Sequence, residues 1–276
     1  IRDSYSILSN WDVSASYDLQ WNKMNADMYG FVYPERFTNL LSVATALRLG
    51  KVKLQASGLA TFINDRVKEG PTPEARQILT PAVFASYKPF EKQDFNVRAF
   101  YKRIFRMPTF NDLYYTDMGN AFLKPEYAEQ FNVSLKYTRN FEKSPFMRML
   151  DVSVDAYYNK ITDKIIAYPK GQQFRWTMLN LGEVEIKGVD AVLNALFTLG
   201  KLEVTTKFQY TYQKAIDITD PADTYYRDQI PYIPWHSGSA ILALFYKGWG
   251  LNYSFIYTGQ RYNQQENLSL IHISEP

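Results

Sequence analysis

Apolar and polar residues alternate with a period of two along most of this chain. In segment 150–159 the even positions are apolar or aromatic, and the odd positions are mostly polar. Segment 202–213 shows the same alternation. Successive side chains of a β-strand point to opposite faces, so this period predicts strands with one apolar and one hydrophilic face.

The pattern predicts about eleven strands and no helix, because no segment shows a 3.6-residue period with helix caps. The approximate strand cores are 10–21, 37–49, 51–65, 78–89, 94–104, 127–139, 148–162, 181–198, 202–215, 236–247 and 250–262. We therefore expect an all-β chain.

The connections between the predicted strands alternate in length. Short ones fall at 50–51, 89–94, 140–145, 200–201 and 247–250, and long ones at 22–36, 66–77, 105–126, 163–180 and 216–235. This alternation favours an antiparallel up-and-down sheet with tight turns at one end and long loops at the other. Strands of a dozen residues exceed the usual five or six and suit a tilted, membrane-spanning β-barrel. A soluble β-sandwich or solenoid shares the alternation and stays an alternative.

The amino-acid composition narrows the choice among these classes of protein. The chain has 22 Tyr and 18 Phe among 276 residues, and tyrosines gather near predicted strand ends, as in the aromatic girdles of membrane proteins. The formal net charge of +3 gives no indication of a nucleic-acid partner. The absence of cysteine excludes disulfides, thiolate metal sites and a cysteine nucleophile.

The segment 101–137 carries the most specific motifs, "FRMPTFNDLYY" followed by "GNAFLKPEYAEQ". It resembles the mid-barrel signature of TonB-dependent outer-membrane receptors. The matching positions are Phe105, Arg106, Pro108, Thr109, Phe110, Asp112, Leu113, Tyr114, Gly119, Asn120, Leu123, Lys124, Pro125, Glu126, Glu129 and Gln130. The stretches "DAYYNKITDKI", "NLGEVEIKGVD", "QIPYIPWHSG" and "YSFIYTGQRY" are similar to family members of the Bacteroidetes type.

We expect the motif residues Phe105, Arg106, Pro108, Asp112, Gly119, Asn120, Lys124, Pro125 and Glu126 to be structural. Pro108 ends regular strand pairing, and Asn111 and Asp112 are able to close a turn through side-chain to backbone bonds. Arg106 and Glu126 are expected to pair across the base of a long loop. Direct contact of Arg106, Asp112 and Glu126 with a ligand is the alternative.

The resemblance implies a fold, a location and partners. Residues 1–267 would be an incomplete antiparallel, up-and-down transmembrane β-barrel, about eleven of the family's 22 strands, with the plug domain absent from this chain. The parent protein would be an active importer in the lipid of the bacterial outer membrane, coupled to the TonB complex through that plug. It would use no cofactor and no resident metal, would not be an enzyme, and would import a ferric siderophore, haem or cobalamin.

The long loops are the expected place for ligand contacts, because aromatic side chains suit an amphipathic organic ligand. The candidates are Tyr114, Tyr115, Phe174, Trp176, Tyr225 and Tyr226. Packing of these loops on one another is the competing interpretation.

Other classes of protein stay open as alternatives: a passive porin, a soluble carbohydrate-binding β-protein, and a barrel hydrolase with His236 as its base. Calcium binding by the aspartates of "DITDPAD" (217–223) is a further alternative to a solvated loop. The end of the chain, 268–276, breaks the alternation and resembles translated sequencing adapter. We expect it, and His272 within it, to be non-native.

Overall fold

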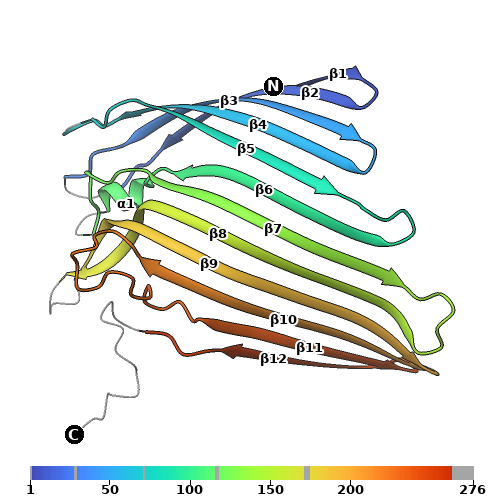
Figure 1. Ribbon diagram of the computed structural model, residues 1–276. Helices are drawn as coiled ribbons and strands as arrows, with labels where there is room; N and C mark the ends of the chain where they lie inside the picture. Colours follow the sequence, from blue (N-terminus) through green and yellow to red (C-terminus); the bar gives the residue numbers. More distant parts are fainter. Residues whose placement is uncertain (1, 28–29, 71, 116–117, 171–174, 263–276) are drawn as a thin grey trace, which may run out of the picture. The chain divides into compact units, whose positions relative to one another are not determined.

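The computed structural model describes residues 2–27, 30–70, 72–115, 118–170 and 175–262. These residues form twelve strands and one short helix (Figure 1). The elements are β1 (Arg2–Leu8), β2 (Trp11–Lys23), β3 (Glu35–Leu49), β4 (Val52–Arg66), β5 (Arg76–Tyr87), β6 (Asp94–Arg106), α1 (Phe110–Tyr114), β7 (Glu126–Asn140), β8 (Met147–Lys170), β9 (Arg175–Leu199), β10 (Leu202–Asp217), β11 (His236–Tyr246) and β12 (Trp249–Thr258).

The strands belong to one sheet and follow one another in chain order from β1 to β12. Neighbouring strands pair in antiparallel fashion from β1 through β4, and again from β9 through β12. The predicted antiparallel, up-and-down, all-β architecture is therefore confirmed. In the described part of the chain, no helix is long and apolar enough to cross a bilayer.

Three details differ from the sequence prediction. The described residues form twelve strands where about eleven were expected, because β1 has only seven residues, too few for its alternation to be recognised. The segment 163–180 is mostly strand, since β8 continues to Lys170 and β9 begins at Arg175. Backbone pairing carries these strands past the point where the side-chain alternation fades. The third is α1, whose five residues are too few to show a 3.6-residue period.

The chain divides into two compact units. Unit 1 comprises Ile1–Ala85, Tyr101–Glu129 and Ile161–Glu183, and unit 2 comprises Ser86–Phe100, Gln130–Lys160 and Val184–Pro276. Unit 1 thus contains α1 and the motif segment. Unit 2 contains β10 to β12 in full.

In unit 2 the strand register produces two chemically different faces. On β10, Val204, Phe208 and Tyr210 share one face, and cross-strand partners of the same face include Leu244 of β11. We call this the apolar face. The opposite face of β10 carries Glu203, Thr205, Lys207, Gln209, Thr211 and Gln213, and we call it the hydrophilic face. Because neighbouring residues of a strand point to opposite sides, the sequence alternation and the register agree.

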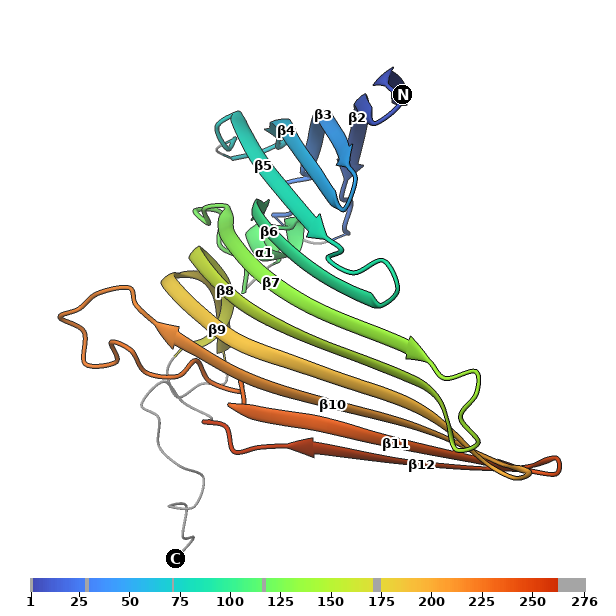
Figure 2. The same cartoon turned by 45° about the vertical axis from the view of Figure 1, so that its right-hand side comes forward.

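Tight turns close the hairpins of unit 2 at one end. The turns between β9 and β10 and between β11 and β12 lie side by side in both views (Figures 1 and 2). Gly200 and Gly248 take positive φ angles of 62° and 88° there, which two-residue hairpin loops require. The long connection 218–235 leaves the other end of β10.

The buried side chains gather near the loop ends of the strands. In unit 1, Leu113 of α1, Leu123 and Ile165 form a cluster against which Tyr114 and Met178 pack. In unit 2, Val184 and Ala215 are fully buried, and Gln229 of the long connection is 3% exposed. The Gln229 side chain accepts the N–H of Ala215 at 3.2 Å, so the connection is tied to β10.

Candidate functional site

The helix α1 begins at a capping box within the "PTFND" motif. The Thr109 hydroxyl accepts the Asp112 N–H at 3.1 Å, and the Asp112 carboxylate accepts the Thr109 N–H at 2.9 Å. These bonds satisfy N–H groups that the first turn of a helix leaves without partners. Pro108, fully buried, stands between β6 and this cap. The turn predicted at Asn111 and Asp112 is thus a short capped helix.

Arg106 connects the end of β6 to β7 and β8. Its guanidinium lies 3.5 Å from the Glu126 carboxylate and 4.0 Å from that of Asp112, and it donates to the Ile165 carbonyl at 3.3 Å. Glu126 also accepts the Ile165 N–H at 3.0 Å. The predicted pairing of Arg106 with Glu126 is present. Its structural consequence is that both polar backbone groups of Ile165 are held by motif side chains.

The Gly119–Asn120 pair is held by close packing and by an amide side chain. A Cβ at Gly119 would lie 2.6 Å from the Tyr115 nitrogen and 2.8 Å from the Leu113 carbonyl, so no larger residue fits without a backbone shift. The Asn120 amide donates to the Met178 carbonyl at 3.0 Å and accepts the Phe122 N–H at 3.0 Å. These contacts tie the segment after α1 to β9.

Asn180 holds the backbone of Lys124, the next part of the motif segment. No sequence motif singled out Asn180 as a site residue. Its side chain accepts the Lys124 N–H at 2.9 Å and donates to the carbonyls of Lys124 and Asp163, at 3.1 and 2.7 Å. Asp163 has a φ of 54°, an uncommon angle for a residue other than glycine. Asn180 opens the quoted stretch "NLGEVEIKGVD", which was the available signal for it. Pro125, fully buried, follows Lys124 directly.

Arg36 anchors the same motif to β3 and β4, and no sequence signal pointed to it. Two of its nitrogens donate to the two carboxylate oxygens of Asp65, each at 2.7 Å, and a third donates to the Pro108 carbonyl at 2.9 Å. The guanidinium also lies 5.2 Å from the centre of the Phe110 ring. The Arg36 and Asp65 side chains are 11% and 4% exposed, so this is a buried, bidentate pair.

Tyr114 lies beside this pair. Its hydroxyl is buried and has no hydrogen-bond partner within the described residues. Burial, followed by the Asp65 carboxylate, raises the pKa of the Tyr114 hydroxyl, while Arg36 opposes the shift. The hydroxyl therefore stays neutral over the physiological range. The ring packs against the cluster of Leu113 and Ile165, which makes Tyr114 a packing residue in this structure.

The other aromatic ligand candidates differ in their surroundings. In unit 1, Tyr115 follows α1 and is 52% exposed, and Trp176 stands on β9 and is 44% exposed. Tyr225 and Tyr226 are half-buried in the connection 218–235 of unit 2. Phe174 lies outside the described residues, as do 268–276 and His272. Tyr115 and Trp176 are thus the candidates whose side chains are exposed enough to contact a ligand.

The aspartates of segment 217–223 are engaged in local turns. Asp220 accepts the Ala222 N–H at 2.9 Å, and Asp223 accepts the Tyr225 N–H at 3.0 Å. Asp217 accepts the Thr219 N–H at 2.9 Å. Within the described ranges, no group of three or more His, Asp or Glu side chains is arranged to hold a metal ion.

His236 contacts aromatic residues of the apolar face. Its Nδ1 lies 2.7 Å from the Tyr210 hydroxyl, and its ring lies 5.2 Å from that of Tyr212. The hydroxyl of the nearby Ser239 donates to the Gln209 side chain at 3.2 Å. His236 is therefore placed as a member of an aromatic group at the loop end of β10 and β11.

Aromatic residues also bound the apolar face of unit 2 at its turn end. Tyr246 is paired with Leu202 at that end, and Tyr212 with His236 at the loop end. The stretch of β10 between these two pairs, 202–212, matches the 9 to 11 residues that a tilted strand needs to cross a bilayer. An apolar band with an aromatic girdle at each end is the pattern of a strand surface that faces lipid.

The opposite face of unit 2 carries a polar network. The Asp151 carboxylate accepts from Thr138 at 2.7 Å and from Asn194 at 3.1 Å, and lies 3.1 Å from the Lys136 ammonium. A carboxylate with three such partners is stable beside water and unsuited to hydrocarbon. The two faces therefore have the opposite solvent preferences that the wall of a membrane barrel needs.

Comparison with known proteins agrees with this arrangement. The family model described as "TonB dependent receptor-like, beta-barrel" matches residues 2–270. A curated relative, the vitamin B12 transporter BtuB of Photobacterium profundum, is 31% identical over 170 residues, which is 59% of this chain and 24% of that protein. The matched region thus spans about a quarter of the relative's length.

Solved structures show the same fold at low sequence identity. The FrpB iron transporter of Neisseria meningitidis is 12% identical, with a TM-score of 0.66 over 94% of this chain and 42% of its own. The hemophore receptor HasR of Serratia marcescens, solved in complex with its hemophore HasA and heme, is 12% identical, with a TM-score of 0.63 over 92% of this chain and 51% of its own. At this identity the likeness concerns the fold alone.

Proposed function

Because this chain belongs to the family of TonB-dependent receptor β-barrels, whose model matches residues 2–270, we propose that it is part of an active importer. Barrels of this family are outer-membrane proteins. The importer takes up a scarce ligand, such as a ferric siderophore, haem or cobalamin. A plug domain, which is not among these residues, gates the passage and responds to the TonB complex.

The observation that carries this proposal is the family match together with the way the motif segment is held. Arg36, Arg106 and Asn180 fix the described parts of the motif segment, 105–115 and 118–126, to neighbouring strands of unit 1 through buried or half-buried polar contacts. A loop whose base is held in this way presents its exposed side chains in a defined position. Tyr115 and Trp176 are the exposed aromatic residues that we assign to ligand contact.

The proposed mechanism involves no covalent chemistry and no catalytic residue. Selectivity comes from aromatic and polar contacts in the loops, and transport from the movement of the plug. Cobalamin is the first ligand to test, because the curated relative is named as a vitamin B12 transporter. Iron chelates and haem come second, since the related folds carry the names of iron and hemophore receptors.

The test is an uptake experiment in the source organism. Labelled cyanocobalamin, haemin and a ferric siderophore are supplied to wild-type cells, to cells without the gene, and to wild-type cells treated with a protonophore. We expect deletion and protonophore each to abolish high-affinity uptake of one of the three ligands, and the ligand to be recovered unchanged. Uptake that needs the gene and survives the protonophore would indicate a passive porin instead.

The loop contacts are tested in the same cells. Trp176→Ala and Tyr115→Ala are expected to raise the ligand concentration needed for half-maximal uptake without lowering the amount of protein in the membrane. Phe122→Ala is the matched control, because Phe122 is also highly exposed in unit 1 and was not assigned to the ligand. An equal effect of all three substitutions would contradict the assignment.

A further inference from the structure

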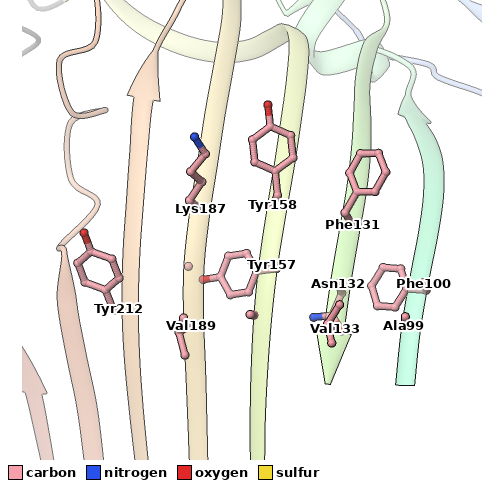
Figure 3. A pocket seen from close by; sticks show the side chains of 12 residues that line it. Ala99, Phe100, Phe131, Asn132, Val133, Tyr157, Tyr158, Lys187, Val189 and Tyr212 are labelled. Atoms are coloured by element: carbon pink, nitrogen blue, oxygen red, sulfur yellow. The ribbon is translucent and has the colours of Figure 1, made fainter. Parts of the chain in front are cut away.

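The apolar face of unit 2 contains an open groove of about 610 Å³ across β6 to β10. Figure 3 shows side chains that line it, among them Phe131, Tyr158, Lys187, Val189 and Tyr212. Most of its walls are aromatic or aliphatic carbon. Phe131 is 46% exposed, so the groove is accessible to a molecule that approaches this face.

A cation stands at the loop end of this groove. In Figure 3 the side chains of Lys187 and Tyr158 both extend towards that end of the strands. The Lys187 ammonium lies 5.4 Å from the Tyr158 ring centre. A lysine whose stem runs along apolar surface and whose ammonium reaches the aromatic girdle has the geometry of a side chain that extends to a membrane interface.

Lys187 belongs to a pair of opposed cations. The register places it directly beside Lys214 of β10, on the same face, and Lys214 lies over the Trp235 ring at 5.5 Å. Directly opposed like charges on a sheet are destabilising unless an anion lies between them or nearby. A second anion beside this lysine pair, Lys187 and Lys214, would relieve the remaining repulsion.

Glu185 is the acidic residue in contact with Lys187. Glu185 lies 2.8 Å from the Lys187 ammonium and accepts a hydrogen bond from the Tyr158 hydroxyl at 3.2 Å. It compensates one of the two lysine charges. Lys160 and Arg227 also act electrostatically on Tyr158 and Glu185, so cations outnumber Glu185 at the loop end of the mostly apolar groove.

We propose that this groove and the lysine pair bind one anionic membrane lipid, with an acyl chain in the groove and the phosphate against Lys187 and Lys214. The length of the apolar band supports this occupant. The band ends at Tyr212 and His236, and Lys214 lies two residues beyond that end, where headgroups lie. An acyl chain suits the aromatic walls, and a phosphate suits the opposed ammonium groups. This proposal rests on unit 2 spanning a membrane. It does not depend on which ligand the importer transports.

The experiment is native mass spectrometry of the intact protein in a mild detergent, titrated separately with dimyristoyl-phosphatidylglycerol and dimyristoyl-phosphatidylcholine. We expect the wild type to bind the anionic lipid more tightly. The double variant Lys187→Gln and Lys214→Gln should lose about fivefold in affinity for phosphatidylglycerol per lysine, with little change for phosphatidylcholine. Glu185→Gln should change the affinity for phosphatidylglycerol in the opposite direction, because it removes the compensating charge.

Two further variants separate the charge from the groove. Lys207→Gln is the matched control, since Lys207 lies on the hydrophilic face of the same strand as Lys214, and it should leave both affinities unchanged. Ala156→Trp fills the groove. It should weaken the binding of both lipids without changing the preference for one over the other.

Equal binding of both lipids by the wild type would overturn the proposal, as would an unchanged preference in the lysine double variant. A protein that appears as a lipid-free dimer would assign the face to a second copy, and this too would overturn it. The uptake experiment above has a separate outcome, so failure of the lipid site and failure of the transport proposal are distinguishable.

Discussion

The motif segment of unit 1 and the strands β10 to β12 of unit 2 are stabilised in different ways. In the motif segment, charged and amide side chains such as Arg36, Glu126 and Asn180 satisfy backbone groups of other strands. In β10 to β12, backbone pairing runs without a break over the paired residues, and most side chains act through the face on which they lie. The first arrangement depends on individual residues, and the second on the alternation of residue types.

The two arrangements should respond differently to substitution. Removing a polar side chain that satisfies a buried backbone group is costly, because the backbone group is left without a hydrogen-bond partner. A residue on a two-faced strand is expected to tolerate exchange for another residue of the same polarity and similar size. The motif segment should thus be sensitive to small changes, and the strands only to changes of face.

The largest expected effect comes from the buried ion pair. Asp65→Ala leaves the Arg36 guanidinium, itself 11% exposed, without its bidentate partner. We expect the free energy of unfolding to fall by about 3–5 kcal/mol, measured by chemical denaturation of the intact protein in detergent micelles. Glu35→Ala, which removes the partner of the exposed Lys23, is the neighbouring control and should cost less than about 1 kcal/mol. Equal losses would show that Arg36 is not the anchor of the motif.

The next effect tests the two faces of β10. Phe208→Lys places a charge in the middle of the apolar face and should cost about 2–4 kcal/mol when the protein is folded in phospholipid vesicles. Thr205→Lys makes the corresponding change on the hydrophilic face of the same strand and should be close to neutral. If both lysines are tolerated equally, the apolar face does not meet hydrocarbon.

Gly119 offers a purely steric test of the motif segment. Gly119→Ala places a methyl group 2.6 Å from the Tyr115 nitrogen, and the forced backbone shift should cost about 1–3 kcal/mol in the same denaturation experiment. Gly58→Ala on β4 is the control, because the nearest atom to its added Cβ is a side-chain carbon at 3.9 Å. A stable Gly119→Ala protein would mean that the turn after α1 rearranges freely.

The smallest of the four effects is expected at Glu126. Glu126→Gln keeps the shape of the side chain and removes its charge towards Arg106, while one oxygen still reaches the Ile165 N–H. Because Arg106 is half-exposed, we expect a loss of about 1 kcal/mol, at the upper end of the range for exposed ion pairs. Glu129→Gln on the same strand should change nothing measurable. A larger loss for Glu129 than for Glu126 would contradict the assigned contacts.

The sequence predicted the two-faced strands well, because alternation is a local property. The cores predicted at 202–215 and 236–247 have ends within two residues of those of β10 and β11. The family motif was recognised from its residue order, and the pairing of Arg106 with Glu126 followed from their places at either side of one loop. The domain limits 1–267 and the Bacteroidetes type stay predictions.

The contacts that were missed join residues far apart in the sequence. Arg36 reaches the Pro108 carbonyl across 72 positions, and Asn180 reaches Lys124 across 56. Neither residue type is unusual at a strand position. Nothing in the sequence distinguishes Arg36 from other polar residues, and the only signal for Asn180 was its place at the start of a family-like stretch. The extension of β8 and β9 through 163–180 was missed because backbone pairing there does not depend on alternation.

The central claim is that unit 2 presents its apolar face to lipid and its hydrophilic face to water. The chain contains no cysteine, so single cysteines placed from 203 to 211 of β10 can each carry a spin label without background from this chain. In phospholipid vesicles, we predict that collision with oxygen will be high at 204, 206, 208 and 210, and that collision with a water-soluble nickel complex will be high at 203, 205, 207, 209 and 211. Accessibilities that show no period of two would contradict the account.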